Sequence, residues 1–136
     1  MKLRVLLALL SFLFTIQAQA ASKPTVAEAE QFMKQLEARL NEIEVKAARA
    51  SWVQENFITD DTQALSADAQ DQLTAATTDL IEQAKRFDGM QLPPELARKF
   101  MLLRLSLTAP APKDPALRKE MTQIGVSLNA DYGKGK

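Results

Sequence analysis

Histidine and cysteine are both missing from this 136-residue sequence. Without histidine the chain lacks the most common general base and the most common metal ligand. Without cysteine it has neither a thiol nucleophile nor a disulfide framework. A Ser-His-Asp triad and a zinc site built from the usual nitrogen and sulfur ligands are therefore excluded. We expect any chemistry that this chain serves to be completed outside it, and we assign it no catalytic, cofactor-binding or metal-binding residue.

An excess of charge of one sign is also lacking, because 17 basic residues balance 17 acidic ones. A near-neutral surface gives no reason to expect nucleic acid or an anionic membrane as a partner. The four glycines form no phosphate-binding loop, and the sequence has no repeats and no strand-like alternation. The remaining signals are helical, so we predict an all-α fold.

The first twenty residues have the layout of a secretory signal peptide. Lys2 and Arg4 give a positive start, an apolar run follows from Val5 to Ile16, and residues 18–20 read Ala-Gln-Ala as a cleavage site. A membrane anchor is the alternative, but the apolar run is shorter than the ~20 residues that a spanning helix needs. We therefore predict a signal peptide over residues 1–20 and an exported, periplasmic or secreted, chain over residues 21–136.

A long helix is predicted from about Thr25 to Asn56. Thr25 and Glu28 have the spacing of a capping box. Apolar or small residues then recur in alternating steps of three and four, a spacing typical of helices that pack along one stripe: Val26, Ala29, Met33, Leu36, Leu40, Ile43, Ala47 and Ala50. The stripe is expected to break at Gln54 and to resume at Phe57. Its alanines favour close packing in a bundle over a free two-stranded coiled coil.

A second helix is predicted to begin at Thr59 or Asp60 and to end at Asp88-Gly89, where glycine favours a helix end. Its expected apolar stripe comprises Leu65, Ala69, Leu73, Ala76, Leu80, Ala84 and Phe87. The connection to the first helix is short, so the two should form an antiparallel hairpin.

Two further helices are predicted after the hairpin. One begins at the prolines of "LPPELARKFMLLRLSL" and is apolar around almost its whole circumference, a pattern typical of a helix buried on nearly every side. The helices of this chain would struggle to cover it. The other is capped by Asp114-Pro115, stops at Tyr132-Gly133 and carries an apolar stripe of Leu117, Met121, Ile124 and Leu128.

Two features near the predicted hairpin turn have a functional and a structural interpretation. Trp52, the only tryptophan, could be a ligand platform, but at a hairpin end we expect it to be a packing residue in the core. Asp60 and Asp61 could bind a metal, but adjacent carboxylates at a helix start are far more often caps.

Charged residues elsewhere are interpreted in the same way. Glu42, Glu44, Lys46 and Arg49 are predicted to form a solvated helix face. The pairs Lys85-Arg86 and Arg98-Lys99 could form a patch for a peptide carboxylate, although helix-dipole pairing and solubility explain them equally well.

Several segments, in order along the chain, resemble the angiotensin-converting enzyme family of zinc peptidyl-dipeptidases. The first is an Ala-rich stretch with a tryptophan followed by an Asn-Ile-Thr element, matched here by Ala50, Trp52, Asn56, Ile58 and Thr59. The second is the segment Ala84 to Asp88, and the third comprises "LPPELARKFMLLRLSLTAPAP" and the terminal "DYGKGK", which resemble bacterial members. Phe57, inserted between Asn56 and Ile58, departs from the animal enzymes at this junction.

The resemblance implies a catalytic zinc held by an H-E-x-x-H helix and a further glutamate, with the glutamate of the motif as general base. None of these residues can be transferred to a sequence without histidine. The family's N-terminal helices form a lid over a deep cleft that admits short peptides. We therefore interpret residues 21–136 as the lid region of a larger, mostly helical peptidase, truncated before its catalytic site, with Trp52 and Phe57 as packing anchors at the hinge end. Peptides are the implied partners and zinc the implied cofactor of the whole enzyme.

Two other interpretations remain open at this point. The chain could be a small periplasmic helical bundle that binds a partner through its apolar third helix and has no enzymatic activity. It could also be the remnant of a decayed gene. The sequence alone does not separate either from the lid of a peptidase.

Overall fold

The computed structural model describes residues 23–107 and 111–135, so the predicted signal peptide lies outside the described part of the chain. Within these residues lie four α-helices and one 3₁₀ helix: α2 (Val26–Asn56), α3 (Asp60–Ala84), η1 (Lys85–Phe87), α4 (Pro94–Leu105) and α5 (Pro115–Gly133). The described residues contain no strand, and the all-α prediction is confirmed. None of the described helices is long and apolar enough to cross a membrane.

Local signals set the helix ends where the sequence predicts them. The Thr25 hydroxyl accepts from the Glu28 amide at 3.2 Å, and the Thr25 amide donates to the Glu28 carboxylate at 2.7 Å. The Thr25 amide, with its hydroxyl, holds the pKa of Glu28 below its ordinary value. At α3 the cap is Thr59, which exchanges hydrogen bonds with Thr62 in the same way. Gly89, with φ of 76°, provides the left-handed residue that ends the α3–η1 segment.

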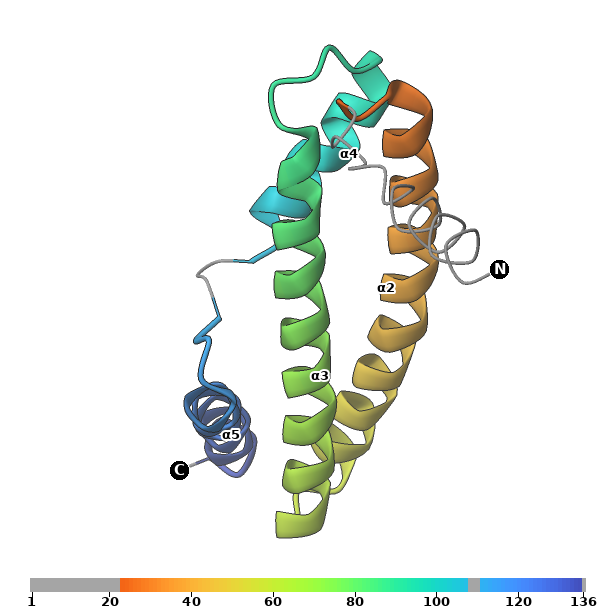
Figure 1. Ribbon diagram of the computed structural model, residues 1–136. Helices are drawn as coiled ribbons and strands as arrows, with labels where there is room; N and C mark the ends of the chain where they lie inside the picture. The colour runs from red at the N-terminus through yellow and green to blue at the C-terminus, as the bar shows by residue number, and fades with distance from the viewer. Residues whose placement is uncertain (1–22, 108–110, 136) are drawn as a thin grey trace, which may run out of the picture.

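Helices α2 and α3 form the predicted antiparallel hairpin (Figure 1). At the open end of the hairpin, α4 packs where α2 begins and α3 ends, and large side chains meet there. Three phenylalanine rings form the centre of this core, with centroids 5.2–6.1 Å apart: Phe32, Phe87 and Phe100. Around them lie Ala29, Met33, Leu36, Leu80, Ala84, Leu96 and Leu103, all buried.

The half of the hairpin near its turn has a different interior. Buried positions there carry small or polar side chains: Ala47, Ala50, Gln54, Ser66 and Ala67. Small residues let two helix backbones approach closely, so this half is held by close packing and by polar contacts such as Gln70 Nε2 to Ser51 Oγ at 3.0 Å. The prediction that the alanines serve close packing against a neighbouring helix is confirmed.

Several details of the predicted stripes are wrong, beginning with Val26, the first residue of the α2 stripe, which is exposed. Gln54 does not break the stripe of α2, because it occupies the next buried position with 2% exposure. Phe57 does not resume that stripe, since it follows the last residue of α2 and its side chain is exposed. On α3, Leu65 is exposed, and the neighbouring Ser66 faces α2 instead, with its hydroxyl 3.4 Å from that of Ser51.

Candidate functional site

Trp52 is exposed, and its predicted role as a core residue and packing anchor is wrong. Its side chain is 62% exposed, as is that of Phe57, the second predicted anchor. The buried positions on either side are Ala50 and Gln54, each two residues away. Two residues correspond to about 200° around an α-helix, so Trp52 lies on the face opposite the one that packs.

An exposed tryptophan leads to a simple expectation. The emission of Trp52, the only indole in the chain, should be water-like and quenched by acrylamide almost as efficiently as in the unfolded chain. Trp52→Ala should change the free energy of unfolding by no more than about 0.5 kcal/mol. Strong shielding from acrylamide in the folded chain would contradict this placement.

The charged residues considered as candidate site residues lie at separate places on α2 and α3 and do not form one cluster. Asp60 and Asp61 lie in the first turn of α3, where the helix dipole favours negative charge. Glu42 and Lys46 lie on the exposed face of α2, as predicted. Their side chains pair at 2.6 Å, and this contact holds the pKa of Glu42 below its ordinary value. The described residues contain no group of three or more histidine, cysteine, aspartate or glutamate side chains able to hold a metal. They therefore do not fit the family's zinc ion, and no chemical step is assigned to them.

The basic residues near the helix ends do not converge on one patch. Lys85 pairs with Glu82, whose pKa this contact lowers, and Lys99 pairs with Glu37 across α2 and α4. Arg86 lies 3.6 Å from Glu28 and covers the ring of Phe87, with its guanidinium 4.5 Å from the ring centroid. Lys85 thus has a partner one turn away, Arg86 and Lys99 have partners on α2, and Arg98 is exposed. A site for a peptide carboxylate is not supported by them.

A groove between α2 and α4 lies beside the core and has a volume of about 380 Å³. Met33 and Leu96 provide its apolar part, and the Lys99–Glu37 pair lies at its rim, 2.6 Å between Nζ and Oε1. Its polar side chains are exposed or paired at the surface, so nothing in the groove selects a ligand.

The most prominent feature of the surface is apolar. On α4 only Leu96, Phe100 and Leu103 are buried, while Met101, Leu102 and Leu105 are 49–70% exposed. On α5 the whole predicted stripe is exposed: Leu117, Met121, Ile124 and Leu128. The prediction that this chain would leave α4 partly uncovered is confirmed. The exposure of the α5 stripe was not predicted, because a periodic pattern shows which face is apolar without showing what covers it.

The fold is thus a long helical hairpin with two appended helices, and its described residues contain no cluster of side chains able to hold a metal. Residues 23–136 match the family model described as angiotensin-converting enzyme, Peptidase_M2. The chain belongs to the angiotensin-converting enzyme family, whose members are zinc peptidyl-dipeptidases that bind peptide substrates. Comparisons with curated proteins and with solved structures give no match.

Proposed function

We propose that residues 21–136 are the lid segment of an exported bacterial zinc peptidyl-dipeptidase, an enzyme that removes dipeptides from the C-termini of peptides. The observation that carries the proposal is the family match over residues 23–136 in a sequence without histidine. The family's histidine ligands must then come from outside these residues. This chain would contribute access control and exclusion of water, the tasks of a lid.

The shape and surface of the hairpin support this role. Helix α2 alone, with 31 residues, is about 45 Å long, which is enough to extend across a deep cleft. Its outward face is polar and charged, as the exposed Glu42–Lys46 pair illustrates, and suits contact with water. The exposed apolar side chains of α4, Met101, Leu102 and Leu105, suit contact with another protein surface. We propose that this apolar surface rests on the remainder of the peptidase and that the polar face of α2 points outward.

The activity of the purified chain tests the first part of the proposal. We expect no stoichiometric zinc by elemental analysis and no dipeptide release from short peptides, with or without added zinc, because the ligands for the metal are absent. A complete member of the family, assayed in parallel, serves as the positive control. Cleavage by this chain that a chelator abolishes would contradict the proposal.

A further inference from the structure

Helix α5 meets α3 with a side that carries both polar and small apolar residues, and not with its apolar stripe. The side of α5 that meets α3 carries residues spaced by four: Arg118, Thr122, Val126 and Ala130. Among these only Ala130 is fully buried. In Figure 1, α5 lies beside the half of α3 that is nearer the hairpin turn. This seating therefore buries little apolar surface.

The apolar stripe of α5 lies on another side and faces water. Leu117, Met121, Ile124 and Leu128 have side chains 47–65% exposed. An amphipathic helix is normally held in place by burial of such a stripe. The hydrophobic effect thus contributes little to holding α5 where it is, and other contacts must do so.

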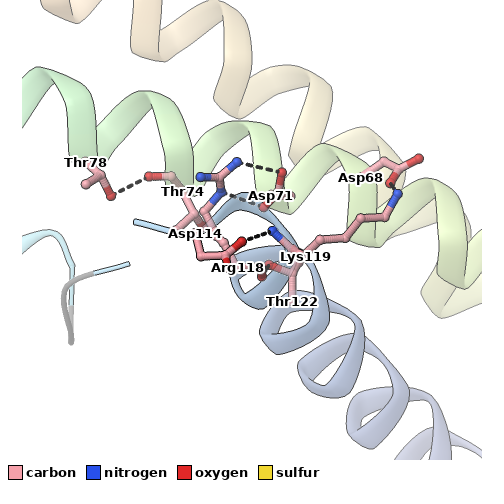
Figure 2. A network of polar contacts seen from close by, with 9 residues as sticks. Asp68, Asp71, Thr74, Thr78, Asp114, Arg118, Lys119 and Thr122 are labelled. Carbon is pink, nitrogen blue, oxygen red and sulfur yellow. Dashed lines mark hydrogen bonds and ion pairs between the residues drawn. The ribbon is translucent and has the colours of Figure 1, made fainter. Parts of the chain in front are cut away.

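Two ion pairs join α5 to α3 (Figure 2). Arg118 donates from Nε to Asp71 Oδ1 at 2.7 Å and from a terminal nitrogen to Oδ2 at 3.4 Å. The Arg118 and Asp71 side chains are 18% and 20% exposed, whereas those of the six other ion pairs among the described residues are 46–69% exposed. In the second pair, Lys119 Nζ lies 3.2 Å from Oδ1 of Asp68, which is one turn before Asp71 on α3. A two-pronged, largely shielded arginine–carboxylate contact is the stronger type of ion pair.

The other end of α5 touches the hairpin turn. A Cβ atom placed on Gly133 would lie 2.9 Å from Ile58 Cδ1, so this close approach requires a glycine or a shift of the isoleucine. This contact is small and apolar. It positions the end of α5, while the charged contacts lie near its start.

We propose that α5 is an electrostatic latch, which the Asp71–Arg118 and Asp68–Lys119 pairs hold against α3 and which is released without unfolding of the hairpin. The core around Phe32, Phe87 and Phe100 contains no residue of α5, so it persists when α5 leaves. When α5 is released from α3, the helix can reorient and turn its apolar stripe toward a different neighbour. The proposal concerns contacts within this chain and does not depend on the lid function.

Amide hydrogen exchange, read by mass spectrometry peptide by peptide, tests the latch. Asp71→Asn keeps the shape of the side chain and removes its charge. We expect exchange across α5 to accelerate about tenfold or more, the effect of losing one strong charge-assisted contact, with exchange in α2 and around Phe87 unchanged. Raising the salt concentration from about 0.05 M to about 1 M should accelerate exchange in α5 of the original chain, because salt screens such pairs.

Two further variants make the result decisive. Glu42→Gln removes an equally short ion pair within α2 and should leave exchange in α5 unchanged. The exchange of partners, Asp71→Arg with Arg118→Asp, should restore much of the protection that Asp71→Asn removes. The latch is overturned if α5 exchanges at the same rate in Asp71→Asn and at both salt concentrations, or if α5 and the hairpin core always lose protection together.

Discussion

Phe100→Ala is expected to destabilise the chain by about 3–5 kcal/mol. Phe100 is 1% exposed, and its ring lies 5.4 Å from that of Phe87 and 6.1 Å from that of Phe32, measured between centroids. The substitution would leave a cavity where α2, α4 and η1 meet, and it would remove two aromatic contacts that add to simple burial. Equilibrium unfolding in urea, followed by circular dichroism, measures the loss.

The adjacent residue provides a matched control for this prediction. Met101 is on the same helix but is 49% exposed. Met101→Ala should therefore change the free energy of unfolding by under about 1 kcal/mol. If Phe100→Ala proves too unstable to fold, Phe100→Leu should still unfold at a lower urea concentration than Met101→Ala. Equal effects at the two positions would contradict the placement of the aromatic core.

Ala29→Leu is expected to cost about 1–3 kcal/mol, although leucine is nearly as good a helix former as alanine. Ala29 is 0% exposed and belongs to the same core as Ala84, which is also 0% exposed. A larger side chain at this position must push α2 away from the elements packed against it. Thermal unfolding of the variant should show a lower midpoint than that of the original chain.

Ala38→Leu makes the same chemical change on the exposed side of the same helix. Ala38→Leu should change the free energy of unfolding by no more than about 0.5 kcal/mol and should therefore leave the thermal midpoint close to that of the original chain. If Ala29→Leu is as stable as Ala38→Leu, the hairpin is more loosely packed at its open end than the structure shows.

The helix ends were predictable from the sequence because short-range chemistry sets them. Thr25 with Glu28, Asp114 before Pro115, and Gly89 each act within a few residues, so no knowledge of the tertiary structure is needed. The antiparallel hairpin followed from the short connection. The family resemblance, carried by segments from Ala50 onward, is confirmed by the match over residues 23–136.

The orientation of individual helix faces was less predictable, because it depends on what the neighbouring helix offers. Near the hairpin turn the buried face of α2 continues from Ala50 to Gln54, and Trp52, two residues from each, lies on the opposite face. The position on the helix therefore outweighs hydrophobicity for these residues. The prediction for Leu65 fails in the same way, since the neighbouring Ser66 occupies the position that faces α2.

The surface features were predictable in part. The near-complete apolar circumference of α4 indicated that its exposed side would need another cover, and the structure shows which residues form that side. The Asp71–Arg118 contact joins residues 47 positions apart on different helices, so no local pattern pointed to it. Export and the signal peptide stay predictions, because residues 1–22 lie outside the described part of the chain.

The central claim is that this chain serves a zinc peptidase whose metal site lies outside the present sequence. The most direct test is the nucleotide sequence that follows the codon for Lys136 in the source genome. We expect an open reading frame that encodes an H-E-x-x-H motif and a further glutamate downstream. A stop codon directly after Lys136 would contradict the lid function and would leave a small helical binding protein or a decayed gene as the explanation.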